Sequence, residues 1–208
     1  MQAGQRMVAS DGYEVMLFPL PYIYISQGEY GDYSHQGILA MDFIGWNASG
    51  RVYDAPLYAP CTCRCVARWT SADHGQVFQS INPVHTPSGL QYVNFMCFHD
   101  ENPIASVGDT FTQGQIFAHT GTAGHVTGDH THFNTANGTY AGWEHVPPEN
   151  KGQLVNSNHI YDICYVNSTV LYHPLDYPWV TYTGGTIESL KKAKFPWALY
   201  ARKLRDKY

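Results

Sequence analysis

Two histidines separated by one residue, His130 and His132, form the most informative chemical motif of the chain. They follow a glycine-punctuated stretch that contains Gly121-Thr-Ala-Gly124 and Gly128-Asp129. On a strand, residues two apart project from the same face, so both imidazoles would point toward one site. Such a pair can supply one metal ligand and one neighbouring acid–base group. A coincidental surface pair is the alternative, so the motif needs support from elsewhere in the chain.

Three residues that precede the motif, His35, Asp42 and His99, give that support. His35 and Asp42 offer an imidazole and a carboxylate, which are both suitable zinc ligands. Asp42 lies in an otherwise apolar run, residues 39–44, where a carboxylate without a partner would be costly. His99 ends an apolar run at residues 92–99, where a lone histidine is more often a satisfied core residue than a functional one. Three protein ligands and one open position are typical of a catalytic zinc site.

Composition and charge exclude several other classes of function. Among the 208 residues, 12 are Lys or Arg and 11 are His, and no lysine precedes Lys151. Residues 191–208 carry seven bases and one acid, a net charge of +6, which leaves −11 on residues 1–190 out of the total of −5. A body this acidic does not favour nucleic-acid binding. The missing lysines exclude a Schiff base, a Walker-type phosphate site and a carrier lysine from the first 150 residues.

The sequence also gives expectations about compartment and cysteines. We find neither a secretory signal in the first thirty residues nor an apolar run near the roughly 18 residues of a membrane span. We therefore expect synthesis without an export signal and no membrane insertion. Cys61, Cys63 and Cys65 fit neither a Cys-x-x-Cys motif nor a disulfide framework, so buried free thiols are expected.

Short runs rich in Val, Ile, Phe, Tyr and Thr, separated by turn residues, predict an all-β fold. The strands of this fold must position the histidines and Asp42. Strands are expected at residues 22–26, 39–44, 63–69, 92–99, 115–119 and 130–135, with weaker ones near 166–171 and 180–182. Residues 137–159 are polar and contain Pro147-Pro148, which indicates a long surface insertion. A basic amphipathic helical segment is expected at residues 186–208. It would pack on the domain or contact an anionic cell-wall polymer or a partner chain.

These residues resemble those of the LytM/lysostaphin-type zinc metallopeptidases, which cut peptidoglycan cross-links. The resemblance runs from about Tyr22 to Phe133. It is carried by Tyr33-Ser-His35 with Ala40-Met-Asp42-Phe, by Ala55-Pro-Leu-Tyr-Ala-Pro60, and by the segment from Gly108-Asp-Thr through Gly121-Thr-Ala-Gly124 to His130-Thr-His132-Phe133. It implies a mostly antiparallel β-sandwich or partly closed barrel of the lysostaphin-like, duplicated hybrid motif type, with a short helical C-terminal tail.

The resemblance also implies roles for individual residues. His35, Asp42 and His132 would bind one Zn²⁺ per chain, and His99 and His130 would be the catalytic pair. The family has three residues between its first histidine and its aspartate, whereas His35 and Asp42 are separated by six. Either the extra residues loop out, or Asp32 or another acid replaces Asp42. Tyr30 and Tyr33 are candidates for a tyrosine that stabilises the transition state, His125 could line the cleft, and Tyr140 and Trp143 of the insertion could contact substrate.

The predicted organisation is therefore a zinc metallopeptidase domain at residues 1–185, with an insertion at about 137–160, and a basic helical segment at 186–208. The expected function is a zinc-dependent endopeptidase that acts at the bacterial cell wall on the peptide stems or cross-links of peptidoglycan. Without a signal peptide it would be a phage lysin or a tail-associated hydrolase, or a bacterial enzyme expressed without its leader. The alternatives are a non-catalytic wall-binding or virion structural module, and a structural metal site closed by a fourth protein ligand. Candidates for all five site residues are present, which favours an enzyme.

Overall fold

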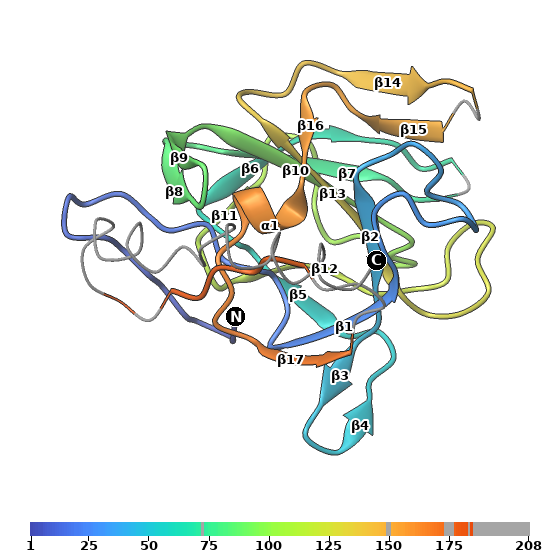
Figure 1. Cartoon of the computed structure of the whole chain (residues 1–208), viewed down its shortest axis with the longest axis horizontal. Helices are drawn as coiled ribbons and strands as arrows, with labels where there is room; N and C mark the ends of the chain where they lie inside the picture. Colours follow the sequence, from blue (N-terminus) through green and yellow to red (C-terminus); the bar gives the residue numbers. More distant parts are fainter. Residues whose placement is uncertain (72, 149–150, 173–176, 183, 185–208) are drawn as a thin grey trace, which may run out of the picture.

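The computed structural model describes residues 1–71, 73–148, 151–172, 177–182 and 184, and their regular structure is almost entirely β-sheet (Figure 1). The main sheet has the strand order β11-β6-β7-β10-β13-β2-β1-β17, and β16 pairs with β13 off this path. The strands are β1 (Tyr22–Gln27), β2 (Ala40–Phe43), β6 (Cys63–Arg68), β7 (Gln76–Ser80), β10 (Val93–Phe98), β11 (Thr110–Phe111), β13 (Thr131–Asn137), β16 (Ser157–Asn158) and β17 (Thr169–Tyr172). Among the described pairs of this sheet, β1 and β17 are parallel and the others are antiparallel.

Four two-stranded sheets and one short helix complete the described part of the chain. They are β5 (Pro56–Tyr58) with β12 (Ile116–His119), β3 (Trp46–Asn47) with β4 (Gly50–Arg51), β8 (Val84–Thr86) with β9 (Gly89–Gln91), β14 (Trp143–Val146) with β15 (Lys151–Leu154), and α1 (Ile160–Ile163). The predicted all-β, mostly antiparallel fold is confirmed. In the described residues the main sheet stays open, with β11 and β17 at its edges, and does not close into a barrel.

The two faces of the central strand β10 are covered by different elements. On one face, fully buried aromatic rings meet: Phe78 and Phe117 have centroids 4.8 Å apart, and Phe95 and Phe117 have centroids 5.7 Å apart. Because Phe117 belongs to β12, the β5–β12 sheet forms a second layer beneath the main sheet. On the other face, Met96 packs in a cluster with Leu154 of β15. This double coverage explains why both faces of the 92–99 run are apolar.

The expected strands at residues 22–26, 39–44, 63–69, 92–99, 115–119 and 130–135 correspond to β1, β2, β6, β10, β12 and β13. The weaker expectation near 166–171 overlaps β17. The expectation of a strand at 180–182 is wrong, because this stretch makes a single β-bridge between Val166 and Thr181. The five cysteines are buried free thiols, as predicted.

Residues 137–159 are more ordered than the predicted surface insertion. They include the β14–β15 hairpin, which lies over the upper part of the sheet in Figure 1. Leu154 is fully buried, and Trp143 lies directly against Gly152, where a Cβ atom would fall 2.0 Å from the indole ring. The expected helical segment at 186–208 lies outside the described residues. Within the described part, no helix is long and apolar enough to cross a membrane.

Candidate metal centre

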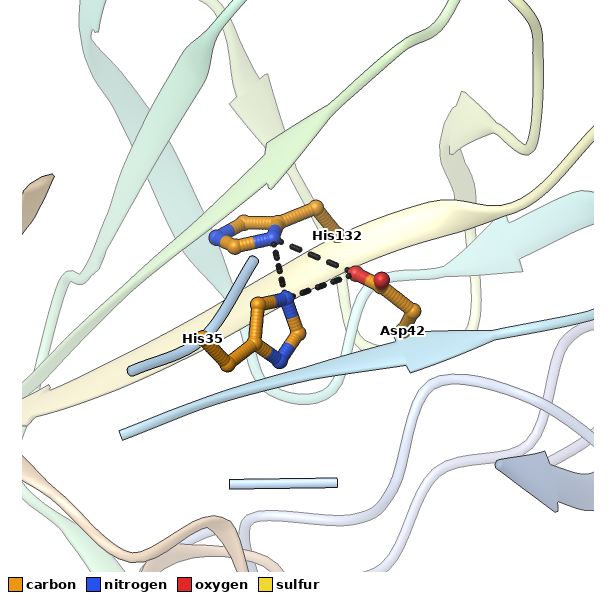
Figure 2. Close-up of side chains that lie close together, drawn as sticks. All are labelled: His35, Asp42 and His132. Carbon is orange, nitrogen blue, oxygen red and sulfur yellow. Dashed lines mark hydrogen bonds and ion pairs between the residues drawn. The ribbon is translucent and has the colours of Figure 1, made fainter. Parts of the chain in front are cut away.

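Three buried side chains, His35, Asp42 and His132, meet on one face of the main sheet (Figure 2). The β14–β15 hairpin covers the same face, because its Trp143 packs on Phe98, the cross-strand partner of His132. Asp42 of β2 and His132 of β13 are direct cross-strand partners, so their side chains lie on the same face of the sheet. His35 comes from the turn before β2, where the Ile38 N–H donates to the His35 carbonyl and Gly37 has a φ of 81°. This turn absorbs the long spacing between His35 and Asp42. Asp32 is exposed and is not part of the group.

The distances within this group match those around a tetrahedral ion. His35 Nε2 lies 3.0 Å from His132 Nδ1, and both nitrogens lie 3.2 Å from Asp42 Oδ1. Zinc bonds of about 2.0–2.1 Å in a tetrahedron separate neighbouring ligand atoms by about 3.3 Å. The group of mutually close ligand atoms contains three residues of the described chain. The donor set therefore fits zinc with a position left for water or substrate.

Hydrogen bonding supports a cation at this point. His35 Nδ1 donates to the carbonyl oxygen of Gly28 over 2.9 Å. In the neutral ring the Nε2 lone pair is then directed at the carboxylate oxygen of Asp42, so the two acceptors repel each other unless a proton or a metal ion lies between them. His132 Nε2 is buried and has no hydrogen-bond partner, which leaves Nδ1 as the atom that faces the group.

The electrostatics of Asp42 follow from the same contacts. Burial raises the pKa of Asp42, but hydrogen bonds and charge from His132 and His35, which act when a proton lies between a ring and the carboxylate, outweigh it, so the pKa lies well below its usual range. The Gln27 amide also donates to Asp42 Oδ2 over 3.0 Å. The pKa of His132 is lowered, chiefly because its ring is buried. Both residues are therefore held in the deprotonated forms that bind a metal ion.

His99 and His130 lie beside these three side chains. Their ring centroids are 4.7 Å apart, and His130 Nε2 is 3.8 Å from Asp42 Oδ1. The Nδ1 atoms of His99 and His130 donate to the carbonyl oxygens of Ala123 and Gly128, each over 2.8 Å, which leaves each Nε2 atom for other partners. Burial, followed by the nearby His130, lowers the pKa of His99 to about 4. His99 also has a φ of 79°, a strained conformation for a residue other than glycine and one that is enriched at functional sites.

The site opens into a cleft of about 1030 Å³. Of the residues expected around the substrate, Tyr33, His125 and Trp143 line this cleft together with His99, His130 and two of the ligands, Asp42 and His132. Tyr30 is not among the lining residues and lies edge-on to His159. Tyr140 packs in the hydrophobic cluster around Met96.

An aromatic group that sequence reasoning missed supports His132. The Phe98 ring stacks on the His132 imidazole with centroids 5.3 Å apart and planes 19° apart. Trp143 of the hairpin and Trp69 pack against Phe98 at centroid distances of 5.7 Å and 5.6 Å. Phe98 and His132 are cross-strand partners, so the alternation of residues 92–99 was the available signal. Gln27 had no comparable signal, because a glutamine at a strand end is common.

The chain is similar to a bacteriophage morphogenesis protein. It is 36% identical over 174 residues to "Morphogenesis protein 1" of Bacillus phage B103, and the match covers 83% of this chain and 46% of that protein. The chain thus spans about half the length of this curated relative. No protein-family model matches the chain.

Several solved peptidase structures are similar to parts of the chain. A zinc-containing peptidase from Vibrio cholerae has a TM-score of 0.43 at 16% identity, over 72% of this chain and 44% of that chain. The catalytic domain of a prophage-encoded M23 protein from Enterococcus faecalis has a TM-score of 0.42 at 16% identity, over 64% and 88%. The catalytic domain of lysostaphin from Staphylococcus simulans has a TM-score of 0.40 at 19% identity, over 57% and 84%. The ligand assignment made above rests on distances within this chain.

Proposed function

We propose that this chain is a zinc-dependent endopeptidase of the LytM/lysostaphin type that hydrolyses peptide cross-links or stems of bacterial peptidoglycan. The observation that carries the proposal is the convergence of His35, Asp42 and His132 at 3.0–3.2 Å beside two histidines whose Nδ1 atoms are fixed to backbone carbonyls. Three ligands with an open position and two oriented imidazoles at a cleft form the set of groups that peptide hydrolysis needs.

His35, Asp42 and His132 would hold the zinc ion, which acts as a Lewis acid toward the scissile carbonyl and the attacking water. His99 and His130 can exchange protons only at Nε2, because their Nδ1–H groups are donated to Ala123 and Gly128. With its pKa lowered to about 4, His99 is neutral at pH 7 and can accept a hydrogen bond from the attacking water. The second imidazole, His130, can donate from Nε2 to the carbonyl oxygen as negative charge develops there, once Nε2 has taken up a proton.

The cleft around these groups suits an extended peptide. Phe98 and Trp143 form an aromatic wall of the cleft, and the exposed Tyr33 also lines it. Apolar walls with a few directed polar groups are typical of sites that bind a small segment of substrate. Peptide bonds in the stems or cross-links of the wall are substrates of this size.

The name of the phage relative favours a protein that belongs to the virion over a lysin released at the end of infection. The place of action would then be the bacterial cell wall at the moment of infection. The same name also supports the second candidate, a structural module of the virion that retains the fold without catalysis. Residues 186–208, with seven bases against two acids, would contact an anionic wall polymer or another virion protein. Deletion of these residues should then weaken binding to purified walls.

The direct test of the enzymatic proposal is to incubate the purified chain with bacterial cell walls and analyse the fragments by mass spectrometry. New amino termini should appear, a chelator should abolish their release, and added Zn²⁺ should restore it. His132→Ala should remove both zinc and activity, whereas His130→Ala should retain zinc and lose activity. Full activity in excess chelator, or in His132→Ala, would rule the mechanism out. A chain that binds zinc and walls but releases no fragments would favour the structural module.

A further inference from the structure

The carbonyl oxygen of Gly28 sets the orientation of the ligand His35. It accepts a hydrogen bond from His35 Nδ1 over 2.9 Å and a second one from the Gly31 N–H over 3.2 Å. The first bond directs Nε2 toward Asp42 and His132, where the metal would bind. Mutation of a group that fixes the far nitrogen of a ligating histidine typically lowers metal affinity about 10- to 100-fold. Whatever holds the Gly28 carbonyl in place therefore contributes to the site.

Glu29, the next residue, ties this carbonyl to a distant part of the chain. Its side chain is buried, with 4% of the residue exposed. Oε2 accepts from His159 Nδ1 over 2.6 Å, and Oε1 accepts from the Ile160 N–H over 3.0 Å at the start of α1. The Glu29 N–H donates to the hydroxyl of Tyr177 over 3.1 Å. A buried carboxylate is costly unless it is hydrogen-bonded in this way, so these contacts fix both the side chain and the backbone of Glu29.

The partner of Glu29 is itself held by packing. The His159 ring stacks on Tyr161 with centroids 4.7 Å apart and planes 14° apart, and Tyr30 lies edge-on at 6.4 Å. Gly28 lines the cleft, whereas Glu29 and His159 are not among the lining residues. Glu29 therefore lies outside the cleft, and the carbonyl of its neighbour Gly28 is the group that joins it directly to a residue of the metal centre.

We propose that Glu29 is a positioning residue of the metal centre, which by bonding His159 and Ile160 holds the Gly28 carbonyl where it orients His35 Nε2. The inference rests on the proposed zinc site. Glu29→Ala leaves the Ile160 N–H and the His159 Nδ1–H without their acceptor and frees the turn, so it should weaken zinc binding about tenfold, at the low end for an outer-shell contact. Glu29→Gln should retain most of the affinity, because its amide oxygen can still accept from Ile160 and the other tautomer of His159 can accept from its amide N–H.

The test is a Zn²⁺ titration of the full, metal-free chain by calorimetry, with the visible absorption spectrum of the Co²⁺ form as a second readout of ligand geometry. Glu14→Ala is the matched control. Glu14 also joins distant segments by accepting from the backbone N–H and the hydroxyl of Thr62, and it does not line the cleft. The expected result is a tenfold loss of affinity and an altered Co²⁺ spectrum in Glu29→Ala, near-native values in Glu29→Gln and unchanged affinity in Glu14→Ala.

Three results would overturn the inference. Native affinity and spectrum in Glu29→Ala would show that Glu29 does not position the ligand, and an equal loss in Glu14→Ala would show a general effect of destabilisation. If Glu29→Ala does not fold, His159→Ala decides, because it removes one of the two side-chain bonds and should cause a smaller loss of affinity. Native affinity in that variant would also overturn the inference. Failure of the wild-type chain to bind Zn²⁺ would instead overturn the proposed function itself.

Discussion

His132 and Asp42 are cross-strand partners of β13 and β2, and His132 Nδ1 lies 3.2 Å from Asp42 Oδ1. The next strand continues the same row, because Phe98 of β10 is the cross-strand partner of His132 and its ring stacks on the imidazole. A slip of one residue in strand register would move these side chains to the opposite face of the sheet. The candidate metal centre therefore depends on the register of three central strands, and only His35 is supplied by a turn.

Removal and return of zinc should change the stability of the chain. The three ligand atoms lie 3.0–3.2 Å apart, so a bound ion would hold β2, β13 and the turn of His35 together. At a free Zn²⁺ concentration of 100 times Kd, the native state gains about 2.7 kcal/mol, which corresponds to a rise in Tm of roughly 5 to 10 °C for a domain of this size. Thermal unfolding followed over a zinc titration measures this rise. His132→Ala should show none of it, and a rise equal to that of wild type would argue against the assigned ligands.

Loss of either neighbouring histidine should separate catalysis from metal binding. His99 and His130 are oriented by backbone carbonyls and are not members of the group of close ligand atoms. His130→Ala and His99→Ala should each lower the rate of wall hydrolysis by about 100-fold or more, the usual contribution of a positioned acid–base group. Zinc content measured by elemental analysis should stay at one ion per chain. Asp42→Ala is the contrasting variant, since it should lose the ion as well as the activity.

Gly121 joins the segments of His99 and His130 and should not tolerate a side chain. Its N–H and carbonyl exchange hydrogen bonds with the backbone of His130, and a Cβ atom here would lie 2.1 Å from the carbonyl oxygen of His99. Gly121→Ala should therefore lower activity sharply. Zinc binding should change less, because His35 and Asp42 lie on other segments and His132 is held in β13 by its pairing with β2 and β10. Gly128→Ala is the comparison, since its Cβ atom would meet Arg51 at an ordinary 3.6 Å and the Gly128 carbonyl that accepts from His130 Nδ1 is retained. Equal activity in both variants would show that the contact at Gly121 relaxes without consequence.

The sequence predicted the residues of the site better than the contacts that orient them. His130 and His132 are two apart on a strand, and Asp42 is a carboxylate in an apolar run, so both carry a signal that depends on residue type. The orienting groups are the carbonyls of Gly28, Ala123 and Gly128. Every residue has a backbone carbonyl, so the residue type does not indicate which of them bonds a histidine. They become visible only once turns bring distant segments together.

The strands that sequence reasoning missed have physical causes of the same kind. In β7, Gln76 and Ser80 are polar but fully buried, so the strand has no alternation of apolar and polar residues. In the β14–β15 hairpin, the ring of Trp143 lies on Gly152 of the other strand, which is a fit between a large residue and the residue without a side chain. Periodicity cannot detect either feature, because both depend on what packs against the strand.

The pKa of His99 makes the stability of the chain depend on pH in a defined window. Burial and the neighbouring His130 lower this pKa from 6.5 to about 4 in the native state. Between these values the unfolded state binds a proton that the native state does not bind, so the contribution of His99 to the free energy of unfolding is fully present above pH 6.5 and is lost as the pH falls toward 4. His99→Gln removes the titrating group. Its free energy of unfolding, measured by urea denaturation of the metal-free chain, should therefore fall less steeply than that of wild type across this window. Above pH 7 the two profiles should run parallel, since His99 is then neutral in both states. Equal slopes below pH 6.5 would mean that the native site accepts the proton, in which case His99 is not held neutral by its burial.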